Sequence, residues 1–327
     1  MKQVVCSSLT GIDDLSITSD ATAPALNPHS VRIEIHGCGV NYPDTLIVRG
    51  AYQFKPPLPF APGGEVAGVI VEVGSEVSRL SVGQRVAGIC LWGGFAEEVV
   101  VPENSVFAVP EAMALTVAAG FTITYGTTIH ALRQRARLQP GETVLVLGSA
   151  GGVGLAAVEI ASAMGATVIA AASTPEKLAL ATAHGATHTI NYLEEDLKRT
   201  VKGLTDGKGV DVVYDPVGGD YTEQALRATA WNGRLLIIGF ASGTIPSLRA
   251  NLLLLKGCQA MGVFWGDFIQ REPDVSAQNM QQLFEWYRSG LLRPHIHGVW
   301  PLEDVRGALH ALENRSVMGK IVLSPKI

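Results

Sequence analysis

Apolar residues in the middle of the chain occur in short unbroken runs separated by helical stretches. Residues 143–147 are all β-branched or apolar, which is the pattern of a strand buried on both faces of a parallel sheet. Similar patterns predict strands at 143–147, 167–172, 188–191, 211–215, 234–239 and 258–263, and helices at 153–164, 175–184, 194–203, 220–230 and about 250–255. This alternation predicts a doubly wound α/β domain with six parallel strands and right-handed crossovers.

The region before residue 122 shows a different pattern, in which short strands are separated by glycine and proline. Residues 31–35 and 95–101 alternate between apolar and polar, and residues 66–73 form another strand candidate that ends at Gly74. These short strands predict a β-rich barrel or sandwich. A proline-rich loop at 52–64 interrupts them, and loops of this length inside a compact domain are commonly functional.

The C-terminal part of the chain predicts two helices and a last strand. Residues 279–289 and 302–312 carry apolar side chains at helical spacing, and residues 320–324 form the strand. We expect this strand to rejoin the N-terminal β-rich region, which makes that domain discontinuous. The predicted domains are therefore 1–122 together with 264–327, and 123–263.

A glycine-rich turn follows the first strand of the α/β region. The residues from Gly148 to Gly154 read Gly-Ser-Ala-Gly-Gly-Val-Gly and lie between a predicted strand and a predicted helix. Glycines at such a place allow a tight turn, a close approach of the backbone to a pyrophosphate, and close packing of helix on strand. The spacing is G-x-x-G-x-x-G rather than G-x-G-x-x-G. Its context nevertheless predicts a dinucleotide site, with the phosphates at the helix N-terminus.

The end of the second predicted strand indicates which dinucleotide binds. Sites selective for NAD place an acidic residue there, which accepts a hydrogen bond from the ribose 2′-OH. In this chain the strand is followed by Ser173 and, four residues later, by Lys177. A hydroxyl and an ammonium group can bind a 2′-phosphate, so we predict NADP rather than NAD. Ser173 is also a candidate N-cap of the next helix, and Glu176 lies in the first turn of that helix.

Composition and charge mainly exclude classes of protein and kinds of site. The chain has 327 residues, is 47% hydrophobic, and has a net charge of −5 with its 25 basic residues scattered, so nucleic acid is not an expected partner. The four cysteines are far apart and form no C-x-x-C motif, so neither a disulfide framework nor a zinc knuckle is expected. No apolar run reaches the ~18 residues that span a bilayer. The N-terminus leads into a predicted strand and not a targeting peptide, so we expect a cytoplasmic protein.

Several stretches taken together resemble a known family. They are residues 39–45, 62–68, 83–86, 139–146, 150–154, 211–219 and 319–322. In this order they resemble the medium-chain dehydrogenase/reductase superfamily, and within it the zinc-free NADPH:quinone oxidoreductases related to ζ-crystallin. Residues 51–60 and 251–256 are most similar to the quinone oxidoreductase-like branch.

The resemblance implies a GroES-like β-domain, completed by the C-terminal segment, and a Rossmann domain, with the active cleft between the two. It also implies a homodimer whose interface includes the last Rossmann strand, near residues 258–263. We therefore expect this two-domain fold and this dimeric assembly.

The resemblance further assigns residues to the cofactor. Asn41 is similar to an asparagine beside the nicotinamide, and Thr127 to a threonine near the cofactor in the linking helix. The other expected NADP contacts are Ala150, Gly151, Gly152 and Val153 at the pyrophosphate, Ser173, Lys177 and Tyr192 at the 2′-phosphate and adenosine, Gly239, Phe240 and Ala241 at the nicotinamide ribose, Phe264 and Trp265 at the end of the sixth strand near the carboxamide, and Arg315 at the phosphates.

No metal is expected. Zinc relatives in this superfamily use a cysteine and the histidine of a Gly-His-Glu motif as catalytic ligands. Cys38 lies near the first position, but Gly64 takes the place of the histidine. A catalytic zinc site needs three protein ligands, so Cys38 is interpreted as a small buried apolar residue.

Direct hydride transfer from NADPH to an electron-poor acceptor is the chemistry expected without a Lewis acid. Quinones and α,β-unsaturated carbonyls are therefore the candidate substrates. Asn41 and Tyr52 are the candidate catalytic residues, for orientation and hydrogen bonding. Alternatively, Tyr52 packs only against the loop prolines. Asp44 is expected to fix its own turn, and Trp92 is a candidate to line the cleft.

Two other functions stay open at this stage. An enoyl-thioester reductase would need a basic groove for a CoA phosphate, and Arg49 and Lys55 flank the proline-rich loop. A non-enzymatic NADPH-binding protein is the second alternative, since ζ-crystallin relatives serve as lens proteins or bind RNA. The absence of a basic patch disfavours RNA.

Overall fold

The polypeptide divides into two compact units. The computed structural model describes residues 1–327. The first unit comprises Met1–Ile123 with Pro294–Ile327, and the second comprises Thr124–Arg293. No helix of the chain is both long and apolar enough to cross a lipid bilayer.

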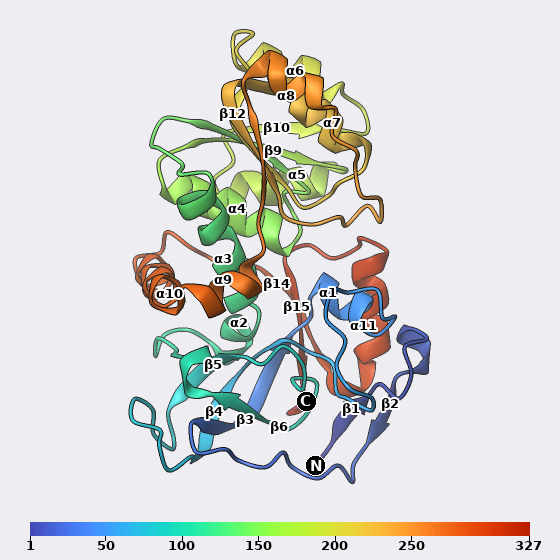
Figure 1. Ribbon diagram of the computed structural model, residues 1–327, viewed down its shortest axis with the longest axis vertical. Coiled ribbons are helices and arrows are strands. Elements are labelled where there is room, and N and C mark those ends of the chain that lie inside the picture. Colours follow the sequence, from blue (N-terminus) through green and yellow to red (C-terminus); the bar gives the residue numbers. More distant parts are fainter. The chain divides into compact units, whose positions relative to one another are not determined.

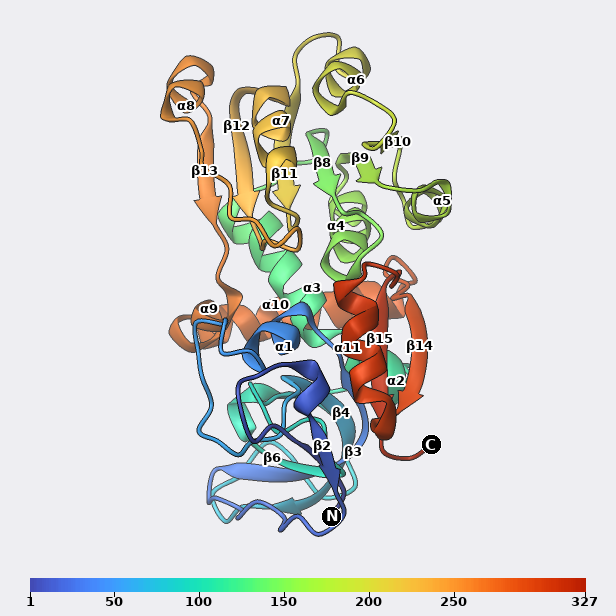
Figure 2. The same cartoon turned by 90° about the vertical axis from the view of Figure 1, so that its right-hand side faces the viewer.

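The second unit is built on a six-stranded parallel sheet (Figure 2). Its strands are β8 (Thr143–Leu147), β9 (Thr167–Ala172), β10 (His188–Asn191), β11 (Val210–Asp215), β12 (Thr229–Ile237) and β13 (Gln259–Gly262). They lie in the order β10-β9-β8-β11-β12-β13, and all neighbouring strands are parallel. This is the 3-2-1-4-5-6 order of a dinucleotide-binding fold, so the predicted doubly wound domain is confirmed.

Five helices alternate with these strands. They are α4 (Gly152–Ala163), α5 (Pro175–Ala183), α6 (Leu197–Leu204), α7 (Asp220–Ala228) and α8 (Ala250–Lys256). The predicted elements agree with the observed ones closely, except that β12 begins at Thr229 rather than at 234. Residues 144–147 of β8 have no exposed surface, as expected of a central strand covered on both faces.

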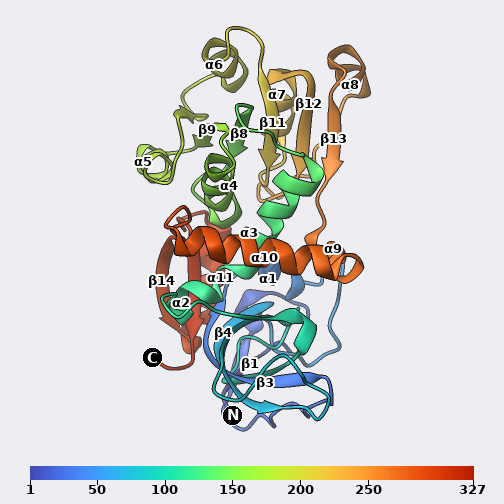
Figure 3. The same cartoon turned by 90° about the vertical axis from the view of Figure 1, so that its left-hand side faces the viewer.

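The second unit also contains helices outside this alternation (Figure 3). Helix α3 (Thr122–Ile129) is followed by a π-helix, η3 (His130–Arg135), and α9 (Trp265–Arg271) and α10 (Pro273–Arg288) follow β13. The side-chain amides of Gln134 and Asn279 join η3 to α10 through reciprocal hydrogen bonds of 3.0 and 3.1 Å. The compact units therefore differ from the predicted domains over residues 264–293, which lie with the parallel sheet rather than with the β-rich unit.

The first unit contains a seven-stranded, mostly antiparallel sheet (Figure 1). Its strands are β3 (Ser30–Gly39), β4 (Glu65–Val73), β5 (Arg85–Ile89), β6 (Glu98–Pro102), β7 (Val106–Ala108), β14 (Ile296–Pro301) and β15 (Lys320–Ser324). The order is β14-β15-β3-β4-β5-β7, and β6 pairs with β3. Strands β1 (Gln3–Val5) and β2 (Ser16–Thr18) form a separate antiparallel pair. Because β15 pairs with β3, the prediction that the last strand rejoins the β-rich region is confirmed.

Short helices cover parts of this sheet. They are α1 (Tyr42–Ile47), α2 (Leu115–Ala119), α11 (Val305–Glu313) and the 3₁₀ turns η1 (Ile12–Asp14), η2 (Glu103–Ser105) and η4 (Leu302–Asp304). Strands β3 and β4 leave no room for a side chain at Gly68. A Cβ atom at Gly68 would lie 1.9 Å from the backbone oxygen of Glu34, so only glycine fits this irregular part of the pairing.

Candidate cofactor and active site

The glycine-rich turn joins β8 to α4 as the sequence predicts. Gly148 has a φ of 58°, which favours glycine, and its carbonyl accepts from the Gly151 N–H at 3.0 Å. A Cβ atom at Gly154 would lie 2.1 Å from the Gly148 oxygen, so this glycine lets α4 pack against the turn. At Gly151 the nearest atom would be 3.5 Å away, which leaves room beside the helix N-terminus. This geometry fits a pyrophosphate bound by backbone N–H groups at Ala150, Gly152 and Val153, whereas the Gly151 N–H is already bonded to Gly148, so a contact of Gly151 with phosphate stays a prediction.

Three residues predicted to contact the 2′-phosphate and adenosine lie at the ends of neighbouring strands. Ser173 follows β9, Lys177 lies in α5, and the Lys177 ammonium donates to the Ser173 hydroxyl at 3.3 Å. Tyr192 follows β10, and the centroid of its ring lies 4.4 Å from that of Tyr221, with the two rings tilted by 44°. The carboxyl ends of adjacent parallel strands meet at one edge of a sheet, so these side chains share the edge where such folds bind nucleotides.

The N-cap of α5 is Thr174, whose hydroxyl accepts from the Lys177 backbone N–H at 3.4 Å. The interpretation of Ser173 as this cap is therefore wrong by one residue. Capping does not occupy the Ser173 hydroxyl, which leaves it for the Lys177 ammonium group. Glu176 is fully exposed in the first turn of the helix, as expected.

Residues 239–241 lie in the turn that follows β12. The Ala241 N–H donates to the Pro216 carbonyl at 3.0 Å, so this turn packs against the segment that follows β11. A Cβ atom at Gly239 would meet nothing closer than that same carbonyl, at 3.6 Å. Gly239, Phe240 and Ala241 thus lie beyond the carboxyl ends of central strands, and their contact with a ribose stays a prediction.

Phe264 and Trp265 do not end the sixth strand, so this placement is wrong, while their contact with the carboxamide stays a prediction. Strand β13 ends at Gly262, Phe264 is the N-cap of α9, and Trp265 begins that helix. The Trp265 indole is buried against Gly126 of α3, where an added Cβ would lie 2.5 Å from the ring. Thr127 is half-buried next to Gly126 on α3, whereas Phe264 is 55% exposed.

A buried polar cluster surrounds Asn41 in the first unit. The Asn41 amide donates to the Glu65 carboxylate at 2.9 Å and to the Gly39 carbonyl at 3.2 Å. The Lys320 ammonium donates to the Asn41 side-chain oxygen at 2.8 Å and pairs with Glu65 at 3.0 Å. We call Asn41, Glu65 and Lys320 the buried triad. Thr122 and Ile123 complete the coordination of Glu65, each donating to its second oxygen at 2.8 Å.

Glu65 and Lys320 were not predicted as site residues, although each lies at an unusual place in the sequence. Glu65 begins β4, directly before the apolar residues 66–71, and Lys320 begins β15, directly before the apolar residues 321–323. A charged residue at the start of a buried run is expected to have a partner, because an unpaired buried charge is costly. Neither pattern alone identifies which residue that partner is.

Asp44 lies in α1 and contacts Asn41 of the buried triad. Its carboxylate accepts from the Asn41 backbone N–H at 2.8 Å, and the Asp44 N–H donates to the Asn41 carbonyl at 3.0 Å, so Asp44 fixes its own turn as expected. Burial raises the pKa of Asp44 to about 7. Tyr52 is half-buried against the core of this unit, and burial, followed by the charge of Asp44, raises the pKa of its phenol.

Cys38 is buried in this unit, consistent with its interpretation as an apolar residue, and burial raises the pKa of its thiol well above the usual range. The structure brings together no group of three or more His, Cys, Asp or Glu side chains able to hold a metal. The absence of zinc stays a prediction that rests on Gly64. Arg315 is exposed just after α11, with a left-handed φ of 55°, and its contact with phosphate also stays a prediction.

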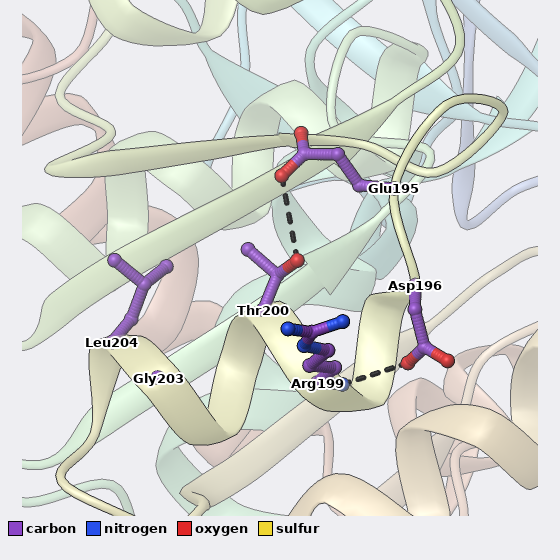
Figure 4. Close-up of a pocket in the computed structure, with 6 residues that line it drawn as sticks. All are labelled: Glu195, Asp196, Arg199, Thr200, Gly203 and Leu204. Atoms are coloured by element: carbon purple, nitrogen blue, oxygen red, sulfur yellow. Dashed lines mark hydrogen bonds between the residues drawn. The ribbon is translucent and has the colours of Figure 1, made fainter.

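A shallow hollow on the second unit lies along α6 and contains no predicted site residue (Figure 4). Its lining residues are Glu195, Asp196, Arg199, Thr200, Gly203 and Leu204. The Asp196 carboxylate accepts from the Arg199 N–H at 2.7 Å, and Glu195 accepts from the Thr200 hydroxyl at 3.4 Å. The first contact caps the N-terminus of α6 and the second joins two side chains, so Asp196, Glu195 and Thr200 have partners without a ligand.

Two family models match the chain, one in each unit. The alcohol dehydrogenase GroES-like domain matches residues 27–111, and the zinc-binding dehydrogenase model matches residues 152–285. The first match confirms the predicted GroES-like domain.

Whole-length relatives agree with these matches. The chain is 42% identical to quinone oxidoreductase-like protein 2 of Rattus norvegicus, covering 99% of this chain and 92% of the relative. It is 40% identical to the homologue of that protein in Nematostella vectensis, over 99% and 89%. Among solved structures, Escherichia coli quinone oxidoreductase complexed with NADPH has a TM-score of 0.91 at 29% identity, over 99% and 100% of the two chains. The CurK enoyl reductase has a TM-score of 0.88 at 28% identity, over 99% and 98%.

Fold, glycine turn and relatives together define a medium-chain dehydrogenase/reductase. Within that superfamily, the chain belongs to the quinone oxidoreductase-like family.

Proposed function

We propose that this chain is an NADPH-dependent oxidoreductase that reduces a quinone or an α,β-unsaturated carbonyl. The observation that carries the cofactor assignment is the pairing of Ser173 and Lys177 at the carboxyl end of β9. A cation and a hydroxyl at this place favour a 2′-phosphate, and no carboxylate at the strand end repels it. The similarity to a quinone oxidoreductase complexed with NADPH supports the same assignment.

The proposed roles fall on residues of both units. Bound NADPH supplies a hydride. The glycine turn would hold its pyrophosphate, and Ser173, Lys177 and Tyr192 would hold its adenosine end. Asn41 would orient the nicotinamide end, and Tyr52 would donate a hydrogen bond to the acceptor oxygen. A phenol is protonated at neutral pH, as a donor requires, and burial raises the pKa of Tyr52 above its ordinary value.

The proposed reaction suits acceptors that are already electron-poor. A quinone accepts a hydride to give a hydroquinone anion that solvent can protonate, whereas an enone gives an enolate that benefits from a donor at its oxygen. We propose that no metal takes part, because Gly64 stands where zinc relatives have a histidine.

The test is NADPH and NADH oxidation by the full chain, with 1,4-benzoquinone, a simple enone and crotonyl-CoA as acceptors, before and after chelation. We expect oxidation of NADPH to exceed that of NADH and to survive chelation. Loss of activity on chelation would overturn the metal-free mechanism, and a preference for NADH would overturn the assignment of Ser173 and Lys177.

An enoyl-thioester reductase is the second candidate function, favoured by the similarity to the CurK enoyl reductase. The structure weakens one argument for it. Arg49, a candidate for binding a CoA phosphate, is already paired with Glu313. Faster turnover with crotonyl-CoA than with benzoquinone would favour this candidate. NADPH binding without turnover of any acceptor would favour a non-enzymatic role.

We also propose a homodimer formed through β13. This strand is at the edge of the sheet and pairs only with β12. Apolar residues near it are unusually exposed, with Trp231 at 70%, Leu254 at 80% and Leu255 at 72%. An exposed edge strand beside such residues favours association. Light scattering after size exclusion should give twice the chain mass, and a Leu254→Glu, Leu255→Glu variant should give the monomer mass.

We also propose a cytoplasmic location.

A further inference from the structure

The buried triad uses nearly all of its own hydrogen-bonding capacity. An ammonium group has three protons, and Lys320 donates them to the Val40 carbonyl at 2.8 Å, to the Asn41 side-chain oxygen at 2.8 Å and to Glu65 at 3.0 Å. Both protons of the Asn41 amide are also committed, to Glu65 and to the Gly39 carbonyl. No N–H of these two side chains is left for a ligand.

These contacts fix which way the Asn41 amide points. Its nitrogen faces a carboxylate and a carbonyl, which are acceptors, and its oxygen faces an ammonium group, which is a donor. Turning the amide over would place NH₂ against the Lys320 ammonium and the oxygen against Glu65, two repulsive contacts in a region shielded from water. Asn41 is nine-tenths buried, so water cannot relieve that mismatch.

We propose that Glu65 and Lys320 are positioning residues that hold Asn41 with its amide nitrogen turned inward, so that Asn41 meets a ligand only as a hydrogen-bond acceptor. This inference rests on the proposed function, in which Asn41 faces the nicotinamide end of the cofactor. The matching ligand group is an N–H donor, such as the carboxamide NH₂ of a nicotinamide. A carbonyl oxygen of the substrate is not a partner for Asn41, and its donor must come from another residue.

A charge swap within the triad tests this directly. Asn41→Asp puts a second carboxylate against Glu65, and Glu65→Gln can put an amide NH₂ against the Asn41 NH₂ and the Lys320 ammonium group. The double variant Asn41→Asp, Glu65→Gln keeps the size and net charge of the triad and restores one donor–acceptor pair, now with residue 65 as donor. It still leaves the new NH₂ beside the Lys320 ammonium group and an aspartate oxygen beside the Gly39 carbonyl. Residue 41 then has oxygen atoms only.

The measured quantity is the Kd for NADPH, from quenching of protein fluorescence. We expect each single substitution to raise Kd about tenfold, the effect of one charge-assisted hydrogen bond, and the double variant to bind NADPH more tightly than Asn41→Asp alone, because only the contact between residues 41 and 65 is repaired. If Asn41 acts on the ligand as a donor, the double variant will bind as weakly as Asn41→Asp, because aspartate has no N–H. That outcome overturns the proposal.

Thr122→Val is the matched control, because it removes a hydrogen bond to the other oxygen of Glu65 and leaves the contacts of Asn41 in place. It should lower the melting temperature and leave Kd unchanged. If every triad variant keeps the Kd of the unmodified protein and loses only stability, the triad is structural and the inference is wrong.

Two further results of these experiments are possible. If the single variants fail to fold, Asn41→Ala serves as the reference instead. The double variant must then bind NADPH more tightly than Asn41→Ala does. If the unmodified protein does not bind NADPH, the proposed function fails and the inference fails with it. If the unmodified protein binds NADPH but the double variant does not recover this binding, only the inference is overturned.

Discussion

The glycine turn of the second unit and the buried triad of the first are built in opposite ways. The turn is made by seven consecutive residues, Gly148 to Gly154, and works through missing side chains that leave backbone N–H groups accessible. The triad is made by three charged or polar side chains from three separate segments, which satisfy one another in the protein interior. Added atoms disrupt a site made of closely packed backbone, whereas the loss of one polar group disrupts a site made of buried side chains that pair with one another.

Removing one partner of the triad should have the largest effect. Lys320→Met keeps the length of the side chain and leaves the Glu65 charge buried without its cation. We expect a loss of about 3–5 kcal/mol in the free energy of unfolding, measured by denaturant titration. The control is Lys326→Met, which removes an exposed pair with Glu34 and should cost less than ~1 kcal/mol. Equal losses would contradict the account of the triad.

Adding an atom to the turn should have the next largest effect. In Gly154→Ala, the new methyl group meets the Gly148 oxygen, so α4 must move away from β8. We expect a loss of about 1–3 kcal/mol in unfolding free energy together with weaker NADPH binding. Gly203→Ala in α6 is the control, since nothing lies within 4 Å of its added carbon, and it should stabilise by up to ~1 kcal/mol. A Gly154→Ala protein as stable as the unmodified one would show that the turn is not tightly packed.

Asp44 should make stability depend on pH. Its pKa is raised from 3.8 to about 7, with Glu65 and Lys320 as the charged neighbours. The folded state therefore binds a proton that the unfolded state releases, and stability falls as pH rises from about 4 to about 7.

The check is Asp44→Asn, which stays neutral at every pH. Its stability relative to the unmodified protein should increase by about 1–2 kcal/mol between pH 5 and pH 7. Parallel stability curves for the two proteins would contradict a raised pKa for Asp44.

The smallest expected effect concerns cofactor choice. Lys177→Ala should weaken NADPH binding about tenfold, corresponding to ~1.4 kcal/mol, and leave NADH binding unchanged, because only NADPH carries the 2′-phosphate. Lys177→Arg keeps the charge and should lose little. A parallel loss for both cofactors would assign Lys177 to the stability of α5 instead.

The difference between the two sites also explains how far the sequence predicts them. Strand β8, its glycine turn and helix α4 are contiguous, so periodicity and glycine spacing predict them together. The return of the last strand to the β-rich region is also predictable, because that strand is apolar and needs a sheet, but its partner β3 is not.

Contacts between distant segments are not predictable in this way. Glu65 and Lys320 each look unusual at the start of an apolar strand, but nothing local says that they meet at Asn41. Helix α10 shows an apolar face without showing which unit it packs on, and residues 264–293 lie with the parallel sheet. Local patterns also leave a cap uncertain by one residue, as at Ser173 and Thr174.

The central claim is hydride transfer from NADPH to an electron-poor acceptor, and its most direct test follows the hydride. Chelator-treated protein would reduce a simple enone with NADPH dideuterated at C4, and the product would be examined by mass spectrometry. The account predicts one deuterium on the β-carbon of the saturated product. A product without deuterium, or NADPH oxidation that stops on chelation, would contradict it.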